Sequence, residues 1–197
     1  MLTSVSQDEE VTLQPARLGM VNCYKHVDID TFDTLTCVHS FGAATEEQKQ
    51  AALDALIQGG NHLNEKYFLY VPAHELWLDQ NLVGMCQFRS VLSEHPDSLT
   101  IHAFFEAIFL LSPYRGRRLS SAFVESIWSI LVPEYMNTIY QAKLNGIEQI
   151  QVVMHADFES QTGESVFNHL YETMNTFFES ISAALEVGVR LRANAGY

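Results

Sequence analysis

The chain has 197 residues, 47% of them apolar, and its 24 acidic and 11 basic residues give a formal net charge of −13. This length and composition predict one domain with a full core. The sequence contains no run of about 18 apolar residues, so we expect no membrane-spanning helix. The acidic excess disfavours general binding to nucleic acids and favours a cationic partner or substrate.

The N-terminus lacks a basic segment followed by an apolar one, so it does not resemble a signal peptide. The cysteines Cys23, Cys37 and Cys86 are scattered and odd in number, which fits a reducing cytoplasm better than a disulfide framework. No spacing of cysteine and histidine resembles a zinc site, so we expect no metal.

Residues 1–20 are polar and aperiodic, which predicts an irregular arm or a short strand. Several possible helix caps in residues 28–39 leave that segment compatible with a helix or a strand. Thr45 is a suitable N-cap, acidic residues follow it, and an apolar stripe then runs up to Gly59-Gly60. This pattern predicts a helix between Thr45 and these glycines.

The next part of the chain is rich in β-formers. Residues 66–71 and 74–79 flank Pro72, and turn-forming residues separate the later apolar runs 82–92 and 101–111. Short turns between such runs predict an antiparallel meander.

Helical periodicity returns after Gly116 and continues to about Val132, where Pro133 is expected to end the helix. Residues 134–144 again have a helical pattern, so we expect an inserted second helix over residues 133–145. Residues 147–154 form an apolar run that predicts a strand, parallel to 101–111 if a right-handed crossover joins them.

Residues 164–174 predict a further helix. Residues 177–192 contain enough Val, Ile and Leu for a last strand, although residues 180–186 also fit a helix. The expected organisation is a single α/β domain spanning residues 1–197.

The turn after strand 101–111 has a distinctive composition. Ser112-Pro stops the strand, and Arg115, Arg117 and Arg118 place three basic residues at the start of the following helix. A helix N-terminus exposes unpaired N–H groups and the positive end of the dipole, which suits a phosphate. Alternatively, the three arginines form a solvated first turn.

The stretch Ser112-Pro-Tyr-Arg-Gly-Arg-Arg-Leu-Ser120 resembles the acyl-CoA pyrophosphate loop of the GNAT superfamily of N-acetyltransferases, usually Arg/Gln-x-x-Gly-x-Gly/Ala. Arg115 holds the first place, while Arg118 and Ser120 stand where the family has its later glycines. The resemblance implies an α/β (α+β) fold with a mixed, mostly antiparallel central sheet flanked by helices. It also implies that acetyl-CoA is held by Phe109, Leu110, Leu111, Arg115, Gly116, Arg117, Arg118, Leu119 and Ser120.

Glu106 lies within the apolar strand 101–111, where an acid is costly unless it is paired or functional. The resemblance implies that Glu106 deprotonates the attacking amine. Alternatively, Glu106 points to solvent or pairs with an arginine.

Tyr171 lies in a segment, Phe167–Phe177, that resembles the later family motif whose tyrosine protonates the leaving thiolate. Alternatively, Tyr171 is a core ring. The family's asparagine after the preceding strand has no clear match, because His155 and Asp157 occupy that region.

The expected activity is direct transfer of an acetyl group from acetyl-CoA to a primary amine of a small molecule or a protein. The rival hypothesis is an inactive GNAT-like fold that serves as an acyl-CoA sensor or protein-binding module. An acidic mimic of nucleic acid is disfavoured because the acids are dispersed. Cys86 lacks an evident His–Asp partner, and Ser120-Ser121 lacks a Gly-x-Ser-x-Gly elbow. Dimerisation through the C-terminal segment is left open.

Overall fold

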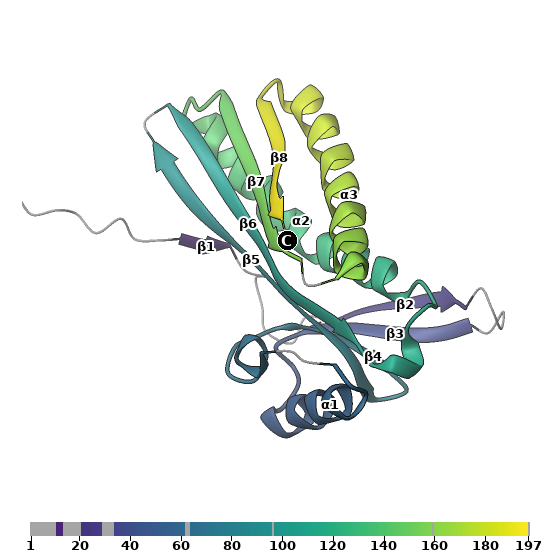
Figure 1. Cartoon of the computed structure of the whole chain (residues 1–197). Coiled ribbons are helices and arrows are strands. Elements are labelled where there is room, and N and C mark those ends of the chain that lie inside the picture. The colour runs from purple at the N-terminus through teal and green to yellow at the C-terminus, as the bar shows by residue number, and fades with distance from the viewer. Residues whose placement is uncertain are drawn as a thin grey trace, which may run out of the picture.

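The protein is described here by a computed structural model, which covers residues 11–13, 21–28, 34–61, 64–95, 97–158 and 160–196. Most of the expected arm at 1–20 lies outside these residues. The elements, shown in Figure 1, are β1 (Val11–Leu13), β2 (Val21–Val27), β3 (Thr34–Phe41), α1 (Glu46–Gln58), η1 (Glu65–Tyr67), β4 (His74–Leu78), β5 (Asn81–His95), β6 (Ser98–Leu110), η2 (Ser112–Tyr114), α2 (Leu119–Leu144), β7 (Gln149–Asp157), α3 (Gln161–Leu185) and β8 (Gly188–Gly196).

One mixed sheet runs through the molecule in the order β2-β3-β4-β5-β6-β7-β8, and β1 pairs with β5. All neighbours are antiparallel except β6–β7 and β7–β8, which are parallel. The predicted mixed, mostly antiparallel sheet with flanking helices is therefore confirmed. The meander β4–β5–β6 and the parallel placement of β7 are confirmed as well.

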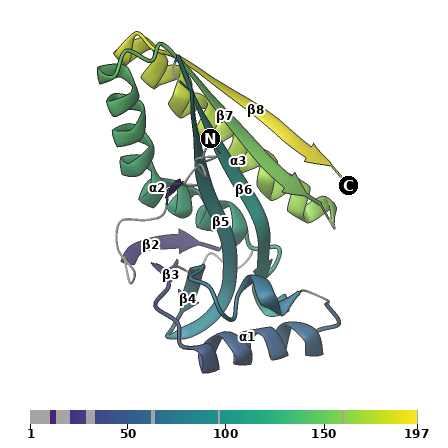
Figure 2. The same cartoon turned by 90° about the vertical axis from the view of Figure 1, so that its left-hand side faces the viewer.

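Two hydrophobic cores lie on opposite faces of the sheet. The larger core joins the sheet to the apolar sides of α2 and α3. The smaller core packs α1 and the segment after it against the lower ends of β5 and β6. In Figures 1 and 2, α1 accordingly lies beneath the lower end of the sheet, while both long helices flank its upper part.

The helix predicted after Thr45 is present as α1. The Thr45 side chain accepts from the backbone N–H of Gln48, and the Gln48 side chain accepts from the Thr45 N–H, which completes a capping box. Leu53 and Leu56 are buried in the smaller core. Local signals were sufficient here because cap and apolar stripe agree.

The strand expected over residues 66–71 is wrong. The N–H groups of Phe68 and Leu69 donate to the Glu65 carbonyl, as in a turn, and η1 replaces the strand. The buried ammonium of Lys49 donates to the carbonyls of Phe68 and Val71, at 3.0 and 2.8 Å. These carbonyls are bonded to α1 rather than to a neighbouring strand, so this apolar run packs as a loop.

The break expected at Pro133, and with it the inserted helix over residues 133–145, is also wrong. One helix, α2, continues from Leu119 to Leu144 with Pro133 inside it. Proline removes one backbone hydrogen bond and bends a helix, and Figure 2 shows α2 bending along its length. Burial on both sides of the proline, at Leu131, Tyr135 and Ile139, holds the helix together.

The C-terminal elements lie later in the chain than predicted. The helix expected over residues 164–174 extends from Gln161 to Leu185 as α3, and the last strand, β8, starts at Gly188. The ambiguous residues 180–186 therefore belong mainly to the helix.

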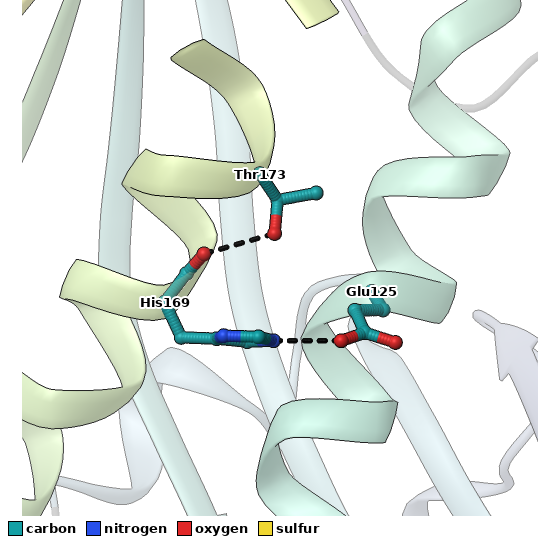
Figure 3. Close-up of polar contacts among 3 residues, drawn as sticks. All are labelled: Glu125, His169 and Thr173. Carbon is teal, nitrogen blue, oxygen red and sulfur yellow. Dashed lines mark hydrogen bonds and ion pairs between the residues drawn. The ribbon is translucent and has the colours of Figure 1, made fainter. Parts of the chain in front are cut away.

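The two long helices also contact each other at the surface. His169 Nε2 on α3 lies 2.8 Å from Glu125 Oε1 on α2, and the Thr173 hydroxyl donates to the His169 carbonyl (Figure 3). Because this pair is partly exposed, it adds little to stability beside the buried rings of Trp128 and Phe178. None of the helices in the described ranges is long and apolar enough to span a membrane.

Candidate functional site

The parallel strands β6 and β7 separate halfway along β6. Their pairing runs from Ser98 opposite Gln149 to Phe104 opposite His155, and β6 then continues to Leu110 with only β5 beside it. A gap therefore opens between the carboxyl ends of two parallel strands, the place where open α/β sheets commonly bind ligands.

A β-bulge lies where the strands separate. Phe105 pairs with Phe88 and Ala107 pairs with Gln87, so Glu106 is the extra residue on β6. Before the bulge, Phe105 faces the larger core, and after it Ala107 and Phe109 pack with the smaller core. The bulge thus exchanges the faces of the strand and places Glu106 at the opening.

The gap continues into a cavity of about 1260 Å³. Its walls are the carboxyl-terminal half of β6, the ends of β7 and β8, the first turns of α2 and α3, and the end of α1 with the residues after it. Two helix N-termini therefore face one cavity, and each directs unpaired N–H groups and a positive dipole end toward it. This electrostatic arrangement favours an anion.

Two residues of the loop before α2 have positive φ angles, a conformation that favours glycine. Gly116 has φ +77°, and Arg118 is left-handed, with φ 57° and ψ 14°. Arg118 is the N-cap of α2, and no side chain among the described residues caps that helix. The first turn of α2, including Leu119 and Ser120, reaches the cavity with its N–H groups uncapped.

The three arginines of this loop have different roles. Arg115 ties the loop down, because its Nε donates to the Leu110 carbonyl at 2.8 Å and its Nη1 donates to Asn61 Oδ1 at 3.0 Å. Arg117, also predicted to bind the cofactor, is not among the cavity-lining residues, and its Nε lies 3.3 Å from the buried carboxylate of Asp28. Arg118 is exposed at the cavity rim, which leaves it best placed to meet an anion.

Of the other predicted cofactor-binding residues, Phe109, Leu110, Gly116, Leu119 and Ser120 line the cavity. The side chain of Leu111, another predicted cofactor-binding residue, packs against the smaller core, because its position after the bulge turns it to that face.

The backbone of β6 offers free hydrogen-bonding groups in the gap. The Leu111 N–H donates to the Val83 carbonyl on β5. Because backbone groups alternate sides along a strand, those of Ile108 and Leu110 point away from β5 and into the gap. The Leu110 carbonyl already accepts a hydrogen bond from Arg115 Nε. The N–H groups of both residues and the Ile108 carbonyl remain for an extended ligand beside β6.

Glu106 lines the cavity and is paired. Its Oε1 accepts from Arg89 Nε at 2.6 Å, and the Arg89 guanidinium also lies over the Phe104 ring, 4.2 Å from its centroid. Pairing with an arginine was the alternative considered from sequence. The pairing fixes the orientation of the Glu106 carboxylate at the opening and leaves Oε2 without a contact to Arg89.

A polar chain follows Phe104 across the sheet. The His155 ring stacks on Phe104 at 4.7 Å, its Nδ1 accepts from Asn194 Nδ2 at 3.1 Å, and its Nε2 lies 3.0 Å from Nδ1 of His102. Burial, and then the neighbouring His102, lower the pKa of His155, so its ring is neutral at pH 7. His155 and Asp157, at the end of β7, both line the cavity.

Tyr171 is not among the cavity-lining residues. Its hydroxyl donates to the Leu191 carbonyl at 3.4 Å, and its ring stacks with Phe167 beside the larger core. The structure therefore does not bring Tyr171 together with Glu106, and it favours the alternative of a core ring. Cys86 is fully buried, and burial raises the pKa of its thiol.

Sequence reasoning missed several cavity residues. Ser160 caps α3 by accepting from the Gly163 N–H, and both residues line the cavity. A serine before an amphipathic run is a readable helix start and could have identified this second N-terminus. Asn61 and Asn194 could not have been found, since only tertiary packing brings them to the cavity.

No family model matches the chain, and no curated protein matches it. Among solved structures, the chain is similar to a ribosomal-protein-alanine N-acetyltransferase from Brucella melitensis biovar Abortus 2308, with 13% identity, a TM-score of 0.32, and coverage of 70% of this chain and 90% of the other. It is also similar to an aminoglycoside acetyltransferase, meta-AAC0020, from an uncultured soil metagenomic sample. The complex with sisomicin gives 13% identity, a TM-score of 0.33, and coverage of 67% and 83%. The complex with trehalose gives 12% identity, a TM-score of 0.31 and the same coverage. These solved structures are acetyltransferases, the class that the 112–120 loop resembles, and at such identities and TM-scores the likeness carries no inference about this chain's activity.

Proposed function

We propose that the protein is an N-acetyltransferase that transfers an acetyl group from acetyl-CoA to a primary amine. The observation that carries this proposal is the gap between β6 and β7, an unpaired strand edge that leads into a cavity faced by two helix N-termini. An extended, amide-bearing ligand with an anionic end complements that combination.

The residues present fit acetyl-CoA. The N–H groups at the starts of α2 and α3, with Arg118 at the rim, suit the anionic pyrophosphate. The free N–H groups of Ile108 and Leu110 suit the amides and the thioester carbonyl of a ligand extended along β6. The cavity, at about 1260 Å³, exceeds the roughly 300–1,000 Å³ of ordinary ligand pockets, which leaves room for a second substrate.

In this proposal the donor supplies an activated thioester, and the chain supplies positioning and a proton acceptor. The gap aligns the acceptor amine with the acyl carbon, and proximity accounts for much of the rate. Glu106 takes the proton from the amine, directly or through water, at the oxygen not held by Arg89. The amine nitrogen forms the new C–N bond while the C–S bond of the thioester breaks, and CoA leaves as a thiolate that water protonates. Arg89 is a positioning residue, since it contacts Glu106 and is not among the cavity-lining residues.

The test is release of free CoA thiol from acetyl-CoA in the presence of a panel of amines. Glu106→Gln should lower kcat by about 100-fold or more while the affinity for acetyl-CoA is unchanged. Tyr171→Phe is the matched control, and its kcat should stay within about threefold of wild type, because Tyr171 lies off the cavity. Equal activity of Glu106→Gln and wild type would contradict Glu106 as the base.

A second candidate function is an acyl-CoA sensor without catalysis. The ion pair between Glu106 and Arg89 favours it, because that contact occupies one carboxylate oxygen. Tight binding of acetyl-CoA without transfer to any amine in the panel would support the sensor over the enzyme.

A further inference from the structure

Opposite α2 and α3, the upper part of the sheet has a face that none of the described helices covers, although Val91 of β5 is buried there. Ser90, Ala103 and Met154 are buried on the helix side. The neighbouring residues on each strand therefore point to the opposite side of the sheet. These are every second residue from Arg89 to His95 on β5, from Ser98 to Phe104 on β6, from Gln149 to His155 on β7 and from Gly188 to Asn194 on β8. We call this surface the open face. No described helix packs on the open face, because α1 packs in the smaller core at the lower end of the sheet. Figure 2 shows α1 at that lower end.

The charge of the open face is opposite to that of the chain. The chain has a net charge of −13, yet no carboxylate stands at any of these alternate positions. They carry Arg89, Arg190 and Arg192. Arg190 and Arg192 are exposed, and neither forms an ion pair within the described part of the chain. A guanidinium presents a planar set of donors that matches a carboxylate, so these two arginines are free to bind one.

The spacing of the arginines suits an extended chain. Arg190 and Arg192 are two residues apart on one strand, which separates them by about 7 Å along β8. Alternate side chains of an extended polypeptide repeat at the same distance. Two carboxylates in an i, i+2 relation would therefore meet both arginines on this flat face.

The open face is continuous with the cavity. Its lowest row contains Phe104, His155 and Asn194, which also line the cavity, and β8 runs from Arg190 through Arg192 to Asn194. A polypeptide lying along β8 therefore reaches the opening where Glu106 lies.

We propose that the open face docks an extended acidic polypeptide, with carboxylates on Arg190 and Arg192, and delivers its amino group to Glu106 through the opening beside Phe104 and Asn194. This inference rests on the proposed function and names its substrate class. It departs from the expectation, based on net charge, of a cationic acceptor. The carboxylates of Glu106 and Asp157 lie at the opening, while the rows of the open face above it carry only arginines as charged side chains and favour the opposite charge.

The first test is binding without any acetyl donor, measured by fluorescence anisotropy. The probes are a short peptide with a free amino terminus, alternating Glu and Ser, and a dye at its carboxyl end, and the same peptide with Lys replacing Glu. The acidic peptide should bind more tightly, and added salt should weaken it. The double variant Arg190→Glu, Arg192→Glu should weaken binding about tenfold or more, while the exposed control Lys25→Glu should change it less than about twofold.

Several results would overturn the inference: preference for the basic peptide, equal affinity of the double variant and wild type, or tighter binding of a labelled oligouridine than of the acidic peptide. Unfolding temperatures matching wild type would show that the variants fold. The assay separates this inference from the proposed function. If acidic peptides bind through the arginines but neither they nor any other amine is acetylated, the transferase proposal fails while the docking face stands. If a basic amine is acetylated equally by wild type and the double variant, the docking inference fails.

Discussion

Gly84 lies on β5 behind the cavity, where a side chain has almost no room, and its replacement tests the packing of β5 against β6. It lies opposite Leu110 across β5 and β6. A Cβ at this position would lie 2.8 Å from the Phe109 carbonyl oxygen and 2.4 Å from Leu110 Cδ2. The leucine methyl can rotate away, whereas the carbonyl belongs to a paired strand and cannot. Gly84→Ala must therefore push β6 away from β5.

We expect Gly84→Ala to destabilise the protein. Overpacking of this kind costs about 1–3 kcal/mol. Lower entropy of the unfolded chain returns about 0.4–1 kcal/mol. The middle of each range gives a net loss of about 1.3 kcal/mol, which corresponds to a fall in Tm of about 3–5 °C for a domain of this size. Differential scanning calorimetry measures this fall.

Gly163→Ala is the matched control. Gly163 lies in the first turn of α3, where an added Cβ would lie 3.5 Å from Ser160 Oγ, an ordinary contact. Its Tm should equal that of wild type or rise, because alanine favours a helix over glycine. If Gly84→Ala melts at or above the wild-type temperature, the close approach of β5 and β6 is refuted.

Two further predictions concern strain and pH. Arg118→Gly should raise Tm by about 2–4 °C, because a non-glycine residue in the left-handed region costs about 1 kcal/mol or more; calorimetry tests this, and a lower Tm would contradict it. Burial lowers the pKa of His39 from 6.5 to about 4, and that of His74 well below 6.5. The unfolded chain therefore binds protons that the folded chain excludes, so their stability contribution is complete above about pH 6.5 and is lost as the pH falls toward 4. The free energy of unfolding should decrease by about 2 kcal/mol between pH 7 and 5 through His39, and His74 should act in the same direction. A urea midpoint that does not fall over this range would refute the prediction.

Local sequence signals were reliable where several of them agreed. Thr45, the acidic first turn and Gly59 predicted α1 correctly because cap, stripe and stop all act within one helix. The turn at Gly116 before an amphipathic helix was equally readable. The carboxyl end of β6 and the loop after it, which form one wall of the cavity, were therefore located from the sequence.

Structural features that depend on a partner far away in the chain could not be predicted from the sequence. The turn at residues 66–71 depends on Lys49, and Arg117 points to Asp28, far earlier in the chain. The bulge at Glu106 exists only relative to the pairing with β5, so alternation within β6 alone did not reveal it. Pro133 stayed inside α2 because burial on either side outweighs the lost hydrogen bond.

Net charge does not describe the open face either. The chain is acidic as a whole, but the order of strands gathers Arg89, Arg190 and Arg192 on one face. Composition predicts the average field of a protein and not the field over one face.

The measurement that tests the central claim most directly is Tm with and without acetyl-CoA. Ligand at about 100 times its Kd should add about 2.7 kcal/mol. This corresponds to a rise of about 5–10 °C. Arg118→Glu, at the cavity rim, should reduce the rise, while Lys25→Glu, on exposed β2, should leave it intact. Such a result would support the cofactor site. An unchanged Tm for the folded wild-type protein in millimolar acetyl-CoA would contradict both the transferase and the acyl-CoA sensor.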